Sequence, residues 1–117
     1  MSQVKLTIVL FLLSIPAFAQ HGIKLAWTQG TCTPTCTITK NTVYSAPTAA
    51  GPFVPIFTST APITSYLDPL TTANQGGQAC YTVTAWTAIE SAQSTPPVCQ
   101  TFPVQGNPPT TVSATQQ

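Results

Sequence analysis

Charged side chains are almost absent from this sequence. Its 117 residues include three lysines, no arginine, two carboxylates and one histidine. Nucleic acids and anionic membranes are bound through clusters of Lys and Arg, so neither is expected as a partner. Without Lys5, which lies in the amino-terminal segment described below, the remaining two lysines and two carboxylates leave a net charge of zero. Strand edges therefore have few charged residues to protect them from association.

The residues needed for catalysis are also scarce. General acid and base chemistry usually needs paired carboxylates or a histidine with an orienting partner. Asp68 is expected in a turn after a strand and Glu90 in a hairpin turn at the other end of the domain, while His21 is expected to be a solvated side chain. Neither a Gly-rich phosphate loop nor a G-x-S-x-G motif is present. The sequence predicts no enzyme, no cofactor and no metal site.

An export signal is the clearest targeting feature. Residues 1–19 carry one positive charge at Lys5, a largely apolar run from Leu6 to Ile15, and Ala17-Phe18-Ala19 as a small-x-small cleavage signal. The run is shorter than the roughly 20 residues of a comfortable membrane span. We expect cleavage before Gln20 and a secreted or periplasmic product without membrane association, with a retained amino-terminal anchor as the alternative.

The cysteine count fits that compartment. Four cysteines in a small exported chain usually form disulfides, and four allow three pairings. Cys32 and Cys36 lie four apart in a Thr/Pro-rich loop, and Cys80 and Cys99 lie on two strands of a predicted hairpin. We expect Cys32 to bond Cys36 and Cys80 to bond Cys99. A zinc site is disfavoured because it would need paired knuckles such as CxxC.

The hairpin prediction rests on strict alternation between residues 78 and 86. Ala79, Tyr81, Val83 and Ala85 are expected to face the core, as is Trp27 earlier in the chain, and Cys80, Thr82, Thr84 and Trp86 are expected on the exposed face. A slip of one residue would exchange the two faces.

Short strands separated by turn signals fill the rest of the chain. The predicted strands are Gly22–Thr28, Thr37–Ser45, Phe53–Thr58, Ile63–Leu67, Ala79–Thr87 and Val98–Val104. Pro47, Gly51-Pro52, Asp68-Pro69 and Gly76-Gly77 mark turns between them. This pattern predicts an all-β, two-sheet sandwich of about seven strands. One domain should span residues 20–104, followed by a disordered Pro/Thr/Gln-rich tail at 105–117.

The order of these segments resembles a fibronectin type III domain of the kind found in bacterial secreted proteins. The segments that carry the resemblance are Ile23-Lys24-Leu25-Ala26-Trp27-Thr28, Ile38-Thr39-Lys40-Asn41-Thr42-Val43-Tyr44-Ser45, Ala49-Ala50-Gly51-Pro52-Phe53, Thr64-Ser65-Tyr66-Leu67-Asp68, Tyr81-Thr82-Val83-Thr84-Ala85-Trp86 and Glu90-Ser91-Ala92. The resemblance implies an immunoglobulin-like sandwich and favours binding over catalysis.

Two positions depart from the family pattern. Asn41 stands where the family has a buried tyrosine, and Ala79 stands at the position of the tyrosine corner. A buried asparagine costs about 1 to 3 kcal/mol unless it is hydrogen-bonded, so a register shift or a backbone partner must compensate. We expect the Cys80–Cys99 bridge to offset the missing tyrosine corner.

A candidate binding face follows from the predicted register. Tyr44 and Trp86 would lie on one threonine-rich sheet face with Thr42 and Thr84, beside a loop at Ile89, and could contact a sugar ring or a protein. Alternatively, Trp86 only packs over the hairpin or the Cys32–Cys36 loop. The sequence favours an exported adhesion or recognition module for a protein or surface glycan. The alternative is a structural subunit or decoration protein of an extracellular assembly, with self-association through strand edges.

Overall fold

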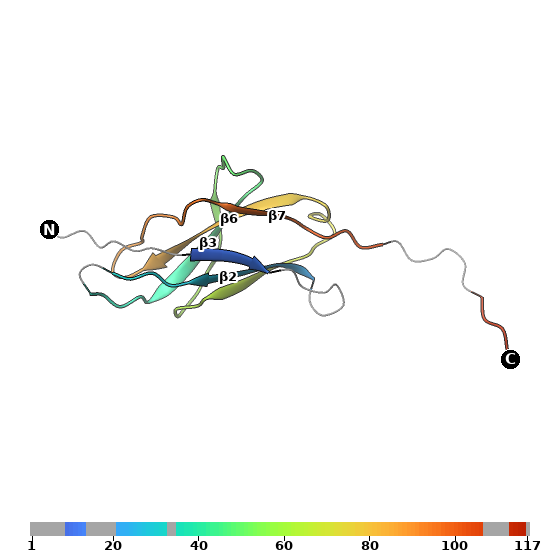
Figure 1. Cartoon of the computed structure of the whole chain (residues 1–117), viewed down its shortest axis with the longest axis horizontal. Helices are drawn as coiled ribbons and strands as arrows, with labels where there is room; N and C mark the ends of the chain where they lie inside the picture. The colour runs from blue at the N-terminus through green and yellow to red at the C-terminus, as the bar shows by residue number, and fades with distance from the viewer. Residues whose placement is uncertain (1–8, 14–20, 33–34, 107–112, 117) are drawn as a thin grey trace.

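The protein is built from β-strands. The computed structural model describes residues 9–13, 21–32, 35–106 and 113–116, with the backbone alone for 9–13. The described residues contain seven strands and no helix (Figure 1). The strands are β1 (Val9–Leu13), β2 (Gly22–Thr28), β3 (Lys40–Ala46), β4 (Val54–Thr58), β5 (Ser65–Pro69), β6 (Gln78–Trp86) and β7 (Val98–Thr101).

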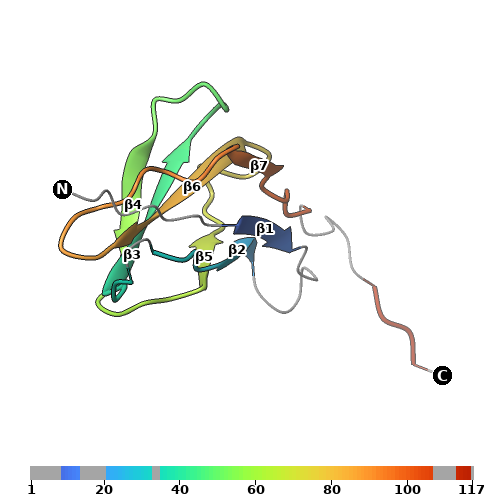
Figure 2. The same ribbon diagram turned by 60° about the vertical axis from the view of Figure 1, so that its left-hand side comes forward.

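The strands form two antiparallel sheets. One sheet has the order β1-β2-β5 and the other has the order β4-β3-β6-β7. Figure 2 shows the two sheets as separate layers. The predicted two-sheet sandwich is thereby confirmed, and β2 to β7 correspond to the six predicted strands, with ends moved by up to three residues.

The seventh strand, β1, was not predicted. It lies within the residues expected to be removed as a signal, and it pairs with β2 from Val9↔Thr28 to Leu13↔Lys24. The cleavage signal at residues 17–19 and most of the tail lie outside the described residues, so both remain predictions. No helix within the described residues is long and apolar enough to cross a membrane.

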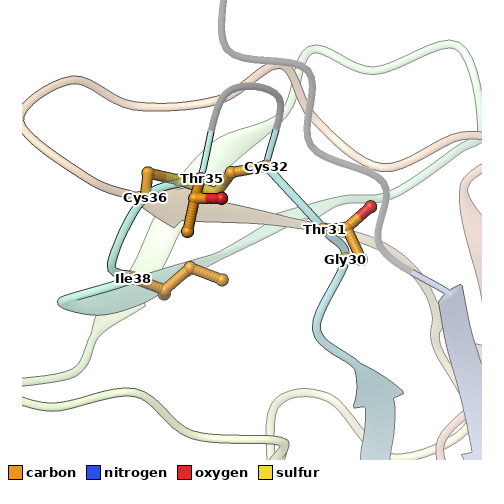
Figure 3. A pocket seen from close by; sticks show the side chains of 6 residues that line it. All are labelled: Gly30, Thr31, Cys32, Thr35, Cys36 and Ile38. Carbon is orange, nitrogen blue, oxygen red and sulfur yellow. A yellow bond between two sulfur atoms is a disulfide. The ribbon is translucent and has the colours of Figure 1, made fainter.

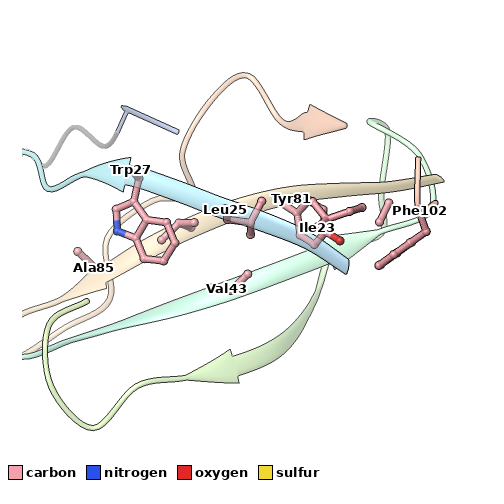
Figure 4. Close-up of a cluster of buried hydrophobic side chains, with 9 residues drawn as sticks. Ile23, Leu25, Trp27, Val43, Tyr81, Ala85 and Phe102 are labelled. Atoms are coloured by element: carbon pink, nitrogen blue, oxygen red, sulfur yellow. The ribbon is translucent and has the colours of Figure 1, made fainter. Parts of the chain in front are cut away.

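The core lies between the two sheets, as the alternation in β2 and β6 predicts. Trp27 and Tyr81 are both buried there, which confirms their predicted placement (Figure 4). The core cluster consists of Ile23, Leu25, Trp27, Val43, Ala79, Tyr81, Val83, Ala85 and Phe102. Each large apolar side chain buried in this way stabilises the fold by about 1.5 to 3 kcal/mol.

Gly22 allows β2 to begin close against β5. Its φ of 143° is rarely adopted by other residues, and a Cβ at this position would collide with the carbonyl oxygen of Asp68. Gly22 pairs with Pro69, and Ile23 pairs with Asp68. The prediction that Asp68-Pro69 forms a turn is therefore wrong, because both residues complete the ladder between β2 and β5.

The predicted hairpin register is confirmed by β6 and β7. Cys80 lies opposite Cys99 with their Cα atoms 3.9 Å apart, and the two residues form a disulfide. Cys32 and Cys36 form the second disulfide, as expected. β7 pairs with only the first four residues of β6, from Gln78 to Tyr81, so the rest of that β6 edge needs other partners.

Candidate functional site

The outer face of the four-stranded sheet carries most of the predicted binding residues. Three cross-strand pairs between β3 and β6 lie on it: Lys40↔Trp86, Thr42↔Thr84 and Tyr44↔Thr82. These residues alternate with Val43 and Val83, which face the core. The structure therefore places Thr42, Tyr44, Thr84 and Trp86 on a common face.

The exposure predicted for this face is wrong at several positions. Thr42 is 3% exposed and Thr84 is 1% exposed, and Cys80 and Thr82 are buried as well. Strand alternation gives the correct direction of each side chain, but it does not show what covers the face. The covering groups come from Tyr44, Trp86 and the segment 90–94, which follows β6 and runs back beside it.

Two serines attach this segment to β6. The backbone N–H of Ala85 donates to Ser91 Oγ at 3.0 Å, and that of Val83 donates to Ser94 Oγ at 2.9 Å. In return, the Ser91 N–H donates to the Ala85 carbonyl and the Ser94 N–H donates to the Val83 carbonyl. The serine hydroxyls thus accept the hydrogen bonds that the carbonyls of a regular neighbouring strand would accept. The backbone N–H and C=O groups of Val83 and Ala85 are all paired in this way. Sequence periodicity carries no signal for such contacts.

Glu90 is held on the outer face by two hydroxyl groups. Its Oε2 accepts hydrogen bonds from Tyr44 Oη at 2.5 Å and from Thr84 Oγ1 at 2.6 Å. Burial, and then the hydrogen bond with Glu90, raise the pKa of Tyr44 to about 12. Glu90 therefore anchors the segment after β6 to the outer face, and its Oε2 already accepts two hydrogen bonds.

Trp86 is half-buried and fixed by contacts with β3. Its Nε1–H donates to Thr42 Oγ1 at 3.0 Å, and Lys40 Nζ lies 4.5 Å from the centroid of the indole ring. Thr42 Oγ1 also shares a hydrogen bond of 3.0 Å with Thr58 Oγ1 on β4. Nearby, Ile89 is 67% exposed. We call Tyr44, Trp86 and Ile89 the Trp86 patch.

The second carboxylate, Asp68, lies on the other side of the sheet. Tyr81 Oη donates to Asp68 Oδ2 at 2.5 Å, which links β6 to β5 across the sandwich. Burial raises the pKa of the Asp68 carboxyl, and the hydrogen bond from Tyr81 opposes part of the rise. Burial also raises the pKa of Tyr81, followed by its bond to Asp68. Because Tyr81 faces the core and Glu90 lies on the outer face, Asp68 and Glu90 cannot act on a common substrate.

Asn41 is fully buried and its side chain uses all its hydrogen-bonding capacity. Nδ2 donates to the Thr84 carbonyl at 3.0 Å and to Gln29 Oε1 at 3.1 Å. Oδ1 accepts from Gln29 Nε2 at 2.6 Å and from the Ile63 backbone N–H at 3.1 Å. The predicted need for a backbone partner is confirmed, and the side chain of Gln29 is an additional partner that the sequence did not reveal.

A shallow depression lies beside the Cys32–Cys36 disulfide. It has a volume of about 360 Å³ and is lined by Gly30, Thr31, Cys32, Thr35, Cys36 and Ile38 (Figure 3). The side chains of this lining are neutral, and both cysteines are committed to the disulfide. Within the described parts of the chain, no group of three His, Cys, Asp or Glu side chains is arranged to hold a metal ion.

Comparisons with known proteins identify the fold. No protein-family model matches the sequence, and no curated protein matches it. The structure is similar to the solution structure of the fourth FNIII domain of a human protein, with a TM-score of 0.56 and 16% sequence identity. The similarity covers 95% of this chain and 91% of the human domain. The chain therefore has the fibronectin type III fold.

Proposed function

We propose that this chain is exported and acts as a small, non-catalytic recognition or adhesion module for a protein or a surface glycan. The two disulfides support an oxidising compartment. The fold itself is compatible with binding or structural roles, but a fold does not determine a function. The proposal therefore depends on the Trp86 patch.

The observation that carries the proposal is the rigid, partly exposed indole of Trp86. The hydrogen bond to Thr42 and the ammonium of Lys40 fix the ring before any ligand arrives. A fixed aromatic side chain loses little conformational entropy on binding. The neighbouring Ile89 adds exposed apolar surface. Aromatic anchors of this kind stack on sugar rings and fill pockets in protein partners.

Binding screens with matched variants test this proposal. The exported protein would be screened against immobilised oligosaccharides and a panel of purified extracellular proteins. For any ligand found, Trp86→Ala and Ile89→Ser should each weaken binding at least tenfold, whereas Val104→Ser should not. Val104 is a suitable control because it is 71% exposed and lies beside Gly76, at the opposite end of β6. Equal binding by all variants would exclude the Trp86 patch as the site.

A second candidate function is that of a structural subunit or decoration protein in an extracellular assembly. The observation that favours it is the exposure of β4, an edge strand on which Val54, Ile56 and Phe57 are 54%, 38% and 39% exposed. Apolar side chains on an uncharged edge promote self-association. In this case, the mass measured by light scattering rises with concentration, and Ile56→Lys restores the monomer. A strict monomer at high concentration contradicts this candidate.

A further inference from the structure

The edge of β2 is occupied by residues that the exported protein is expected to lose. β1 pairs with β2 over five residues, and β5 occupies the opposite edge of β2. Figure 2 shows β1 at the end of this sheet, next to β2. β1 lies inside the apolar run of the predicted signal, so cleavage before Gln20 would remove the whole strand. β2 would then become an edge strand.

Loss of β1 would leave unpaired groups beside the core. The backbone between Lys24 and Thr28 would lose its partners on one side, and exposed strand edges are templates for pairing with another chain. The inward side chains Ile23, Leu25 and Trp27 are buried while β1 is in place. The vacated edge would therefore offer backbone hydrogen bonds to a new strand, on a strand whose inward side chains belong to the core.

β2 has none of the features that usually protect an edge except one charge. Its ladders with β1 and β5 are continuous, without a bulge, and Lys24 is its only charged residue. The other edge strands are β4, β5 and β7, and among them β4 contains Pro55 and has a register shift between Val43 and Tyr44 in its pairing with β3. Proline and bulges both hinder the addition of a strand. Backbone pairing is therefore favoured at β2 and disfavoured at β4.

We propose that the exported chain accepts an extended, apolar strand from a partner protein along β2, between Lys24 and Thr28, in the position that β1 occupies. This inference rests on the proposed export and names the class of partner as a protein that donates a strand. The chain's own Val9–Leu13 indicates the chemistry of the donor, which is about five uncharged residues able to run antiparallel to β2.

The test uses the product recovered after export of the full-length precursor, with its mass measured first. The probe is a synthetic peptide of residues 7–15 with a carboxyl-terminal tri-lysine extension for solubility. At about 100 times its Kd, the peptide should raise the melting temperature by about 10 °C. It should also slow hydrogen exchange at amides within residues 24–28. A control peptide with proline in place of Leu10 and Phe11 should bind at least tenfold more weakly, since proline cannot complete the ladder.

Binding at the β2 edge and cleavage before Gln20 can be tested separately. Ile56→Lys in β4 should leave peptide binding unchanged. Three results would each overturn the strand-acceptor proposal while leaving export intact. They are equal binding of the two peptides, slowed hydrogen exchange at β4 in place of β2, and β2 amides that are already protected by self-association before the peptide is added. A product that still begins at Met1 would overturn both the export and the vacated edge.

Discussion

At the scale of single residues, the buried polar side chain of Asn41 is stabilised by hydrogen-bond partners that are distant in the sequence. Asn41 is bonded to Gln29, Ile63 and Thr84, which come from three different parts of the chain. An asparagine in the core is tolerated because both of its amide hydrogens and both acceptor positions of its oxygen are used.

Replacing Asn41 with leucine should destabilise the domain strongly. The substitution leaves the buried Thr84 carbonyl and the half-buried Ile63 N–H and Gln29 amide without the partner that they have now, and an unsatisfied group costs about 1 to 3 kcal/mol when it is fully buried. We expect the free energy of unfolding, measured by chemical denaturation, to fall by several kcal/mol. Gln100→Leu, at an exposed position on β7, serves as the control. Equal stability of the two variants would show that the Asn41 bonds contribute little.

The raised pKa of Tyr44 predicts a loss of stability at alkaline pH. Its pKa is about 12 in the folded protein, against an ordinary value of about 10. Since the folded state holds the proton more tightly, this contribution is complete below about pH 10 and is lost as the pH rises toward about 12. The melting temperature should therefore fall over that window, and Tyr44→Phe should make the fall less steep. If wild type and Tyr44→Phe had the same dependence of melting temperature on pH, burial and Glu90 would not raise the pKa of Tyr44 as described.

At the scale of strands, we expect the disulfide across β6 and β7 to offset the absence of a tyrosine at Ala79, the position that resembles the tyrosine corner of fibronectin type III domains. The bridge joins residues 19 apart, whereas Cys32 and Cys36 are four apart. In the chain-entropy model, loops of these sizes correspond to about 3 and about 2 kcal/mol. The Cys80→Ala/Cys99→Ala pair should thus lower the melting temperature more than Cys32→Ala/Cys36→Ala. An unchanged melting temperature after reduction of the wild type would refute the stabilising role.

The sequence predicted the strands after residue 20 because period-two alternation and turn residues are local signals. It also predicted the Cys80–Cys99 register, since alternation and cysteine position agree. It missed β1, because a short apolar run is compatible with either a signal segment or a strand. It also missed the burial of Thr42 and Thr84, because their coverage depends on Ser91, Ser94 and Glu90 folding back over β6.

The candidate site was predicted only in part for the same reason. Alternation placed Tyr44 and Trp86 on one face, as the structure has them. The hydrogen bonds of Tyr44 with Glu90 and of Tyr81 with Asp68 join residues 46 and 13 positions apart, so no local pattern could indicate them. Whether the Trp86 patch binds a ligand stays a prediction.

At the scale of the whole molecule, the near absence of charge should make the domain resistant to acid. Acid unfolding usually reflects carboxylates that must be protonated against favourable native interactions. Asp68 behaves in the opposite way, because burial raises its pKa in the folded state. Its ionisation weakens the fold as the pH rises through the raised value, so the difference in melting temperature between wild type and Asp68→Asn should shift in favour of the wild type as the pH falls from 7 to 3. A difference that shifts in favour of Asp68→Asn over the same range would contradict this role of Asp68.

Export, disulfide pairing and loss of β1 are tested together by mass spectrometry of the exported protein with peptide mapping under non-reducing conditions. We expect a chain that begins at Gln20, with Cys32 bonded to Cys36 and Cys80 bonded to Cys99. That result would establish an exported, disulfide-bonded module without β1. A chain that begins at Met1 and carries free thiols would contradict export, and it would make β1 a permanent strand of the fold.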